Sequence, residues 1–357
     1  RLMIGTPEHL RLRHEIEAGR VLGPQLWVAS PQFAGKQYDN GVVITTPDQA
    51  RAAVRKVKGE GYDFVKLTLF ITRPVYDAIT DEAERAGIRV VGHVDDSVGL
   101  ARAIEAHQQI EHLDNYFESA LADSAPMKAS VTQYGVFKPE NWKSLDYIDD
   151  RKLDALAGAT ARAGIWSSPT LNVFNQAFAI GMTDAEIRAR PDWYMMPAEW
   201  RSLYLGARTK YWATPAEESR RKRYVQVRNH LVKAIADSGG KILAGSDTPE
   251  WFHVYGWALH RELASYATAG LTPYQALEAA TRNPAEFLGA LDQWGTIEKG
   301  KRADLVLLAA NPLERITNTE RIEAVSLGGR WMPKAELAAM IRRASDRLGG
   351  APPDSLR

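Results

Sequence analysis

The sequence contains no cysteine. Disulfide bonds and thiolate metal ligands are therefore excluded, and any bound metal must be held by nitrogen and oxygen donors. The cysteine content consequently says nothing about the redox compartment in which the protein works.

An excess of charge of one sign is lacking as well. Lys plus Arg number 45 against 44 Asp plus Glu, so the 357 residues carry a formal net charge of +1. This balance provides no field to hold nucleic acid or an anionic membrane, and a small-molecule substrate is the expected partner. Self-association into a homo-oligomer is left open. We interpret the one dense basic run, Arg220 to Arg223, as a solvated face at the start of a helix.

Long apolar runs are absent too. No run approaches the ~20 residues of a membrane span, and Arg1 to Ile4 do not have the form of a signal peptide. Because these first residues are typical of the middle of a fold, the localisation stays unknown between cytoplasm, periplasm and the outside of the cell.

Short β-branched runs alternate with amphipathic stretches through most of the chain. This alternation is typical of βα units around a parallel sheet, whose buried strands are apolar on both faces. Thr46-Pro47 marks a helix start, and Ala86-Gly87 and Ala163-Gly164 mark helix ends. The expected strands are Leu26 to Ser30, Asp63 to Leu69, Ile88 to Val94, Gln109 to Leu113, Ile165 to Leu171 and Lys241 to Asp247. Helices are expected over Val225 to Ser238, Tyr255 to Ala269, Thr272 to Thr281 and Pro284 to Leu288.

The character of the chain changes near residue 290. Ala303 to Leu308 predicts a strand, and Ile322 to Leu327 before Gly328-Gly329 predicts a strand leading into a hairpin. Lys334 to Leu348 predicts a helix, and a disordered tail is expected after it. We therefore expect a barrel over 1–290, a small β segment over 291–335, and a C-terminal helix and tail over 336–357.

Two stretches, about 115–149 and 172–223, exceed the ~2 to 6 residues usual for loops that follow barrel strands. Both are rich in aromatic residues, so they predict either a lid with an aromatic substrate pocket or a hydrophobic cluster beneath a long loop. The aromatic residues are Tyr116, Phe117, Tyr134, Phe137, Trp142, Phe174, Phe178, Trp193, Tyr194, Trp200, Tyr204 and Trp212.

Polar residues stand at the C-terminal ends of the predicted strands: Lys66, His93, His112 and Asp247. In a barrel of parallel strands these ends converge on one mouth, so we expect the four side chains to meet there. Imidazole nitrogen and carboxylate oxygen are ligands that zinc prefers. Two histidines one βα step apart therefore favour a metal site over two packing residues.

Lys66 lies among apolar strand residues, where an ammonium group loses its hydration at a high cost. Its side chain is interpreted in three ways: it extends to the mouth, it acts as a Schiff-base amine, or it is converted to a carboxylate that bridges metals. Asp247, after the small residues Gly245 and Ser246, could bind metal and take a proton from the attacking water.

Together these motifs resemble the metal-dependent amidohydrolase superfamily, nearest its imidazolonepropionase-like and Xaa-Pro dipeptidase (zinc prolidase-like) branch. The segments that carry the resemblance are Val65-Lys66-Leu67, Gly92-His93-Val94, Ile110 to Leu113, Ala244 to Thr248, Leu259 to Leu263, Gly270 to Tyr274, Ala279 to Pro284 and Gly295 to Pro312.

The resemblance implies an α/β fold of the TIM-like (β/α)8 barrel type with a small β-sandwich. It also implies hydrolysis of an amide C–N bond, in a peptide, acyl amino acid or cyclic amide, by metal-bound hydroxide. In that scheme Lys66 is carboxylated and bridges the metals, while His93 and His112 hold one ion. Asp247 binds the other and is the catalytic base and acid. The cofactor is a divalent metal, zinc by expectation, as one or two ions.

The sequence departs from this family at its beginning. Members carry a His-x-His pair after the first strand, whereas the early histidines here, His9 and His14, fall on a polar helix and are interpreted as surface residues. Arg1 to Gly5 resembles the end of strand two. We therefore expect strand one, most of strand two and the first part of the β-sandwich to be missing, and metal binding and activity to be incomplete.

Other functions remain open from the sequence. The same site could serve an esterase or lactonase, Lys66 could serve a Schiff-base lyase, and a decayed barrel could bind a ligand without catalysis. Among weaker candidates, His260 is interpreted as helix packing or support of the site, and Tyr116 as a packing residue or a substrate contact.

Overall fold

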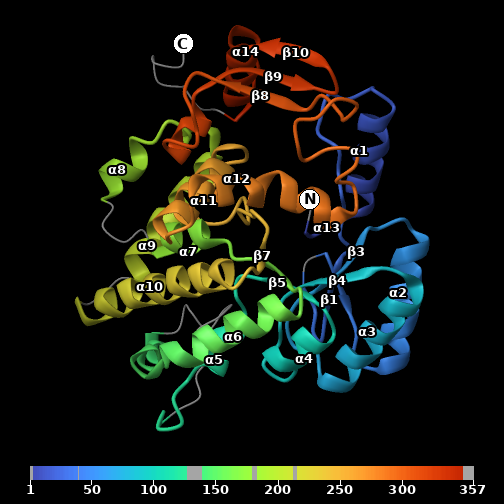
Figure 1. Cartoon of the computed structure of the whole chain (residues 1–357), viewed down its shortest axis with the longest axis vertical. Helices are drawn as coiled ribbons and strands as arrows, with labels where there is room; N and C mark the ends of the chain where they lie inside the picture. The colour runs from blue at the N-terminus through green and yellow to red at the C-terminus, as the bar shows by residue number, and fades with distance from the viewer. Residues whose placement is uncertain (1–2, 39, 127–138, 179–182, 212–214, 349–357) are drawn as a thin grey trace. The chain divides into compact units, whose positions relative to one another are not determined.

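The computed structural model describes residues 3–38, 40–126, 139–178, 183–211 and 215–348 (Figure 1). The chain forms two compact units, the first of Arg1–Val136 with Tyr147–Ser168 and the second of Phe137–Asp146 with Pro169–Arg357. None of the helices in the described ranges has the length and apolar character to cross a membrane. The predicted domain bounds at 290 and 335 stay a prediction.

A parallel sheet forms the centre of the first unit. Its strands lie in the order β2-β1-β3-β4-β5-β6, and each pairs in parallel with its neighbours. The strands are β1 (Gln32–Ala34), β2 (Gly41–Val43), β3 (Phe64–Leu67), β4 (Arg89–Gly92), β5 (Gln109–Glu111) and β6 (Trp166–Ser168); the helices are α1 (Pro7–Glu17), α2 (Pro47–Gly59), α3 (Arg73–Ala86), α4 (Leu100–Glu105), α5 (Tyr116–Ser119) and α6 (Asp150–Arg162).

The helix start and the two helix ends that the sequence predicts in this unit are confirmed: α2 starts at Pro47, and α3 and α6 end at Ala86 and Arg162, close to the marked glycines. Thr46 and Gln49 form a capping box before Pro47, and Gly87, which follows α3, takes the left-handed conformation with φ 60°. Helix α2 buries Ala50, Val54 and Val57. The βα pattern therefore places the helices around the strands, as Figure 1 shows for α2 and α3 beside β3 and β4.

The beginning of the sheet differs from the prediction. Leu26 to Ser30 is not a strand; it makes one isolated parallel bridge, Ala29 to Phe64, and the strand itself starts at Gln32. Pro31 has no backbone N–H to donate, which interrupts the ladder at that point. The strands β1 and β2 escaped prediction because three residues are too few to show a period.

The second unit is mainly helical. Its helices are α7 (Leu171–Phe178), α8 (Asp184–Arg188), η3 (Trp193–Met195), α9 (Ala198–Tyr211), α10 (Pro215–Asp237), α11 (Trp257–Thr268), α12 (Pro273–Ala280) and α13 (Arg282–Leu288), with η2 (Pro139–Tyr147) at its border and the short strand β7 (Lys241–Ile242).

Three predicted elements in this part of the chain need correction. The strand expected to reach Leu171 ends at Ser168, because Pro169 stops the ladder and helix α7 begins. The strand expected to reach Asp247 is only β7. Helix α10 starts at Pro215 instead of Val225, so the basic run lies inside a helix. Arg221 in that run is buried with its guanidinium over the ring of Trp142, which contradicts a purely solvated face.

The C-terminal segment of the second unit follows the prediction. Strands β8 (Leu305–Leu308), β9 (Ile322–Leu327) and β10 (Arg330–Pro333) form an antiparallel sheet, with η4 (Ile316–Glu320) between β8 and β9 and helix α14 (Lys334–Arg347) after β10. Gly328 and Gly329 have φ of 56° and 86°, as a two-residue hairpin turn requires. The tail expected to be disordered, residues 349–357, lies outside the described residues.

Candidate active site

Lys66 lies on β3 and is buried, with 4% of its surface exposed. Its neighbour β4 ends at Gly92, and a Cβ atom at that position would sit 3.0 Å from Cδ of Lys66 and 2.4 Å from the carbonyl oxygen of Leu67. Glycine, at φ 121°, is therefore what allows the lysine stem to pass over the end of β4. This places Lys66 beside the residue that precedes His93.

His93 and His112 follow neighbouring strands, and the structure brings them together. Their rings stack with centroids 4.8 Å apart and planes at 29°. The backbone N–H of His93 donates to the carbonyl of Leu67 at 3.1 Å, and that of His112 donates to the carbonyl of Ser168 at 2.9 Å, which extends the sheet bonding beyond the strand ends. The predicted adjacency of the two imidazoles is therefore present.

The backbone after β5 is strained at the site. His112, Leu113 and Asn115 have φ of 59°, 60° and 64°, a conformation that costs residues other than glycine about 1 kcal/mol or more each. This turn explains why the strand ends at Glu111 and not at Leu113 as predicted. It also directs the chain so that Asp114 returns to His93.

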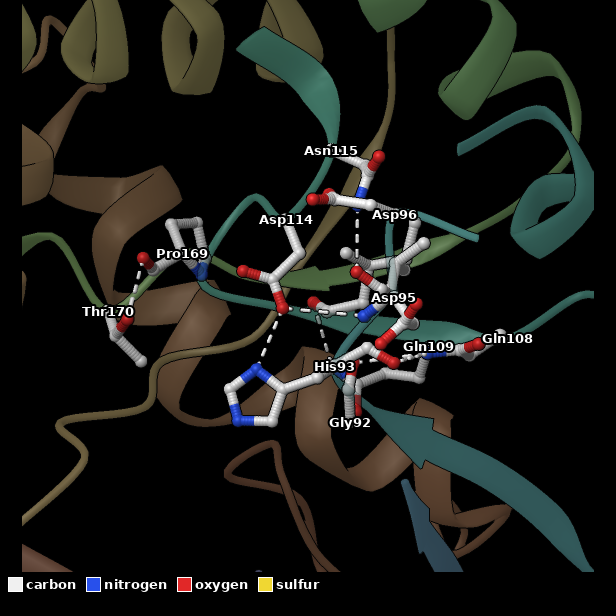
Figure 2. A network of polar contacts seen from close by, with 12 residues as sticks. Gly92, His93, Asp95, Asp96, Gln108, Gln109, Asp114, Asn115, Pro169 and Thr170 are labelled. Atoms are coloured by element: carbon white, nitrogen blue, oxygen red, sulfur yellow. Dashed lines mark hydrogen bonds and ion pairs between the residues drawn. The ribbon is translucent and has the colours of Figure 1, made fainter. Parts of the chain in front are cut away.

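Asp114 is a residue that the sequence prediction missed. Its carboxylate is fully buried, and Oδ2 lies 2.8 Å from Nδ1 of His93 (Figure 2). A carboxylate on Nδ1 favours the tautomer that leaves Nε2 for a ligand, which is the usual support of a metal-binding histidine. The signal was an acid two residues after a strand-end histidine.

Further side chains fix the backbone around His93. Gln108 is fully buried and donates to the carbonyls of Gly92 at 3.1 Å and His93 at 3.0 Å. Asn115 donates to the carbonyl of Val94 at 2.8 Å and to Asp96 at 3.2 Å (Figure 2). The orientation of His93 is therefore set by a polar network as well as by the strand.

Asp247 belongs to the second unit, after β7, and has φ 51°. Next to it, the hydroxyls of Ser246 and Thr248 lie 2.8 Å apart. Burial, and the charge of Asp247, raise the pKa of Glu250 above its usual value. Within the described parts of the chain, no three His, Asp or Glu side chains are grouped to hold a metal. The predicted ligand set of Lys66, His93, His112 and Asp247 therefore stays a prediction beyond the histidine pair.

A second polar cluster, which the sequence did not predict, lies inside the second unit. Glu262 is fully buried and accepts the N–H groups of Leu171 at 2.8 Å and Asn172 at 2.7 Å, the first residues of α7. Burial raises the pKa of Glu262 to about 7. Asn172 Nδ2 lies 2.5 Å from Nε2 of His253, whose Nδ1 donates to the carbonyl of Glu250 at 2.7 Å. These contacts join α7, α11 and the loop after β7.

The aromatic residues of the second long stretch form a packed cluster. Trp193, Tyr204 and Phe252 are buried, and Tyr204 stacks on Trp251 with centroids 5.5 Å apart. This favours the interpretation as a hydrophobic cluster for these residues. Tyr134, Phe137 and Trp212 lie outside the described residues, and so does the side chain of Phe178.

The weaker candidates are placed clearly. Tyr116 is buried with its hydroxyl 2.7 Å from that of Thr160, so it packs inside the first unit. His260 Nδ1 lies 3.0 Å from the Thr319 hydroxyl and supports the packing of α11 on η4. Helix α1, which carries His9 and His14, has no buried residue, as predicted.

Comparison with known proteins gives matches over nearly the whole chain. Residues 5–332 match the model of the Amidohydrolase family. The solved structure of bottromycin amidohydrolase is similar with a TM-score of 0.78 and 24% identity, covering 98% of this chain and 74% of that one. A Xaa-Pro dipeptidase with bound methionine is similar with a TM-score of 0.61 and 19% identity, over 92% and 74% of the two chains. These likenesses confirm the predicted TIM-like α/β fold.

A curated relative matches only in part. Imidazolonepropionase of Thermoplasma acidophilum is 45% identical over 53 residues, which are 15% of this chain and 13% of that protein. The match lies within the branch that the sequence motifs resemble.

Proposed function

Because this chain belongs to the amidohydrolase family, matched over residues 5–332, we propose that it hydrolyses the C–N bond of an amide in a small-molecule substrate. The substrate classes are those that the motifs suggest: a peptide, an acyl amino acid or a cyclic amide. The observation that carries the proposal is the stacked pair His93 and His112 with Asp114 buried behind it.

The donor set fits a divalent cation. Two imidazoles side by side supply nitrogen ligands, and the contact of Asp114 with Nδ1 directs Nε2 of His93 toward a ligand. Members of the family generally use divalent metals. Zinc suits such donors, as one ion or two, with Lys66 in carboxylated form and Asp247 as the further ligands. When bound, the cation would polarise the scissile carbonyl and lower the pKa of water.

The residues of the chain have separate roles in this proposal. Asp114 and Gln108 hold His93 in one orientation, so the site needs little rearrangement when substrate arrives. Lys66 supplies its head group from a buried position, where a carboxylated form would replace the ammonium by a carbamate whose negative charge bound cations would offset. Asp247 would accept a proton from the attacking water and return it to the leaving amine.

The test is hydrolysis of a panel of Xaa-Pro dipeptides, N-acyl amino acids and cyclic amides, with metal content measured on the same sample. Metal binding and activity are expected to be incomplete in this chain, and we expect a chelator to abolish the hydrolysis that it has and Zn²⁺ to restore it. The variant His112→Asn should lose both metal and activity, while His14→Asn on the exposed helix α1 should keep both.

Other outcomes would replace the proposal. Activity confined to esters or lactones would indicate the esterase alternative on the same residues. Activity that survives the chelator, together with borohydride trapping of a carbonyl compound on Lys66, would indicate the Schiff-base lyase. A chain that binds no cation and hydrolyses none of the panel would refute the amide-hydrolase proposal for this chain.

A further inference from the structure

An exposed cluster of one cation and two aromatic rings lies at the C-terminal ends of β1 and β3. Lys36 Nζ stands 3.6 Å from the ring centroid of Phe70, and the ring of Tyr38 stacks on that of Phe70 with centroids 6.3 Å apart. Phe70 is 46% exposed, which is unusual for a large aromatic ring. We call Lys36, Tyr38 and Phe70 the rim cluster.

The backbone holds Phe70 in a strained conformation. Its φ is 65°, which is costly for a bulky residue. Its N–H donates to Oδ2 of Asp95 at 2.6 Å, and a Cβ atom on Gly35 would lie only 1.6 Å from its carbonyl oxygen. Gly35 also donates to the carbonyl of Leu69 at 3.1 Å. These contacts hold Phe70 in a conformation that leaves its ring partly exposed to solvent. Burial of the ring therefore does not explain why the strained backbone is kept.

The position of the rim cluster connects it to the candidate site. Phe70 follows Lys66 by four residues at the end of β3, and Asp95, which fixes Phe70, follows His93 by two. The hydrogen bond between Phe70 and Asp95 thus joins the loops that leave the Lys66 and His93 strands. Phe70 therefore lies on the loop that follows the Lys66 strand, and through it the rim cluster is tied to the loop that follows His93.

We propose that the rim cluster selects substrates that carry an apolar side chain next to a free carboxylate. The rings offer an apolar contact surface, and the Lys36 ammonium beside them offers an ion pair. An aromatic or large aliphatic amino acid with a free carboxyl group presents both features on one residue. This inference rests on the proposed hydrolase function for its purpose, but the binding that it describes needs no turnover.

The experiment measures equilibrium binding to the full chain by calorimetry or ligand-observed NMR. The probes are N-acetyl-L-phenylalanine, its carboxamide, which lacks the charge, and N-acetylglycine, which lacks the ring. We expect the acid to bind about threefold more tightly than the amide, as for an exposed ion pair, and roughly tenfold more tightly than N-acetylglycine.

The variants separate the two contributions. Lys36→Gln should remove the preference for acid over amide, Lys36→Arg should retain it, and Lys56→Gln on the exposed face of α2 is the matched control that should change nothing. Phe70→Gly should remove the preference for phenylalanine over glycine. Glycine suits the positive φ at this position, so the melting temperature of this variant should stay the same or rise.

Three results would overturn the rim cluster as a selectivity element. The first is equal binding of the three probes by the unmodified chain. The second is a preference that persists in Lys36→Gln and Phe70→Gly. The third is a lower melting temperature for Phe70→Gly, which would give the ring a packing role. Lack of hydrolysis in the same NMR spectra would count against the proposed function only.

Discussion

His93 and His253 are both held by hydrogen bonds, but in different ways. His253 is 2% exposed, and its two ring nitrogens contact Asn172 and the carbonyl of Glu250. Burial lowers its pKa to about 4. His93 uses Nδ1 on a buried carboxylate and stacks against a second imidazole. A histidine is a ligand candidate when a partner holds one ring nitrogen and a second ligand side chain lies beside the ring, as at His93. In His253 both ring nitrogens already contact groups of its own unit.

Both regions around these histidines contain backbone at positive φ: Phe70, His112 and Asn115 after β3 and β5, and Thr170, Trp251 and Phe252 near Asn172 and His253. What separates the regions is the use of their polar contacts. The contacts around His93 orient one imidazole beside another. The cluster of Asn172, His253 and Glu262 instead satisfies the start of α7 and connects it to α11. The first region is the one that we propose for chemistry, whereas the contacts of the second connect helices of its own unit.

The largest expected effect comes from the histidine pair. His112→Asn should lower hydrolysis by at least about a hundredfold and remove the bound cation, because the loss of one ligand leaves an incomplete site. Compared with the unmodified chain in the absence of metal, its melting temperature should change little. Metal analysis, kinetics and thermal unfolding on the purified variant would check this; full metal occupancy in the variant would assign the histidine to packing.

The support of His93 should give the next largest effect. Asp114→Asn keeps the shape of the side chain but removes the carboxylate on Nδ1, so metal affinity should fall by about 10- to 100-fold. Competition with a fluorescent zinc chelator measures that affinity. An unchanged affinity would mean that Asp114 only supports the backbone.

Glu262 should make stability depend on pH. Burial raises the pKa of Glu262 from its ordinary 4.5 to about 7 in the folded state, so the folded state binds more protons between these two pH values. The stability that this raised pKa contributes is fully present below about pH 4.5 and is lost as the pH rises through about 7. Denaturant unfolding from pH 5 to 8 measures this dependence. As the pH rises, the free energy of unfolding of the unmodified chain should fall more steeply than that of Glu262→Gln. Parallel curves for the two proteins would contradict this.

The smallest effect is expected at His253. His253→Leu leaves the buried amide of Asn172 without its ring partner, which should cost about 1 to 3 kcal/mol of stability. Metal content should stay unchanged, since the contacts of this histidine are to its own unit. Chemical denaturation with metal analysis tests both statements. Loss of metal without loss of stability would assign His253 to metal binding instead of packing.

The sequence predicted those parts of the fold that repeat a period or end at a marked residue. Helices α2 and α3 and the hairpin at Gly328-Gly329 followed from caps, glycines and alternation. The short strands β1 and β2 did not, because Pro31 and short length hide their pattern. His93 and His112 were predictable as strand-end residues. Asp114 was missed: its place two residues after His112 was a signal, but its contact with His93 depends on a left-handed turn through His112 and Leu113, and leucine rarely adopts that conformation.

Zinc-edge anomalous diffraction from crystals of the full chain grown with Zn²⁺ is the most direct test. We expect an anomalous peak within bonding distance of ring nitrogens of both His93 and His112. Zinc bound only elsewhere, or no peak beside these two rings at full zinc exposure, would contradict it.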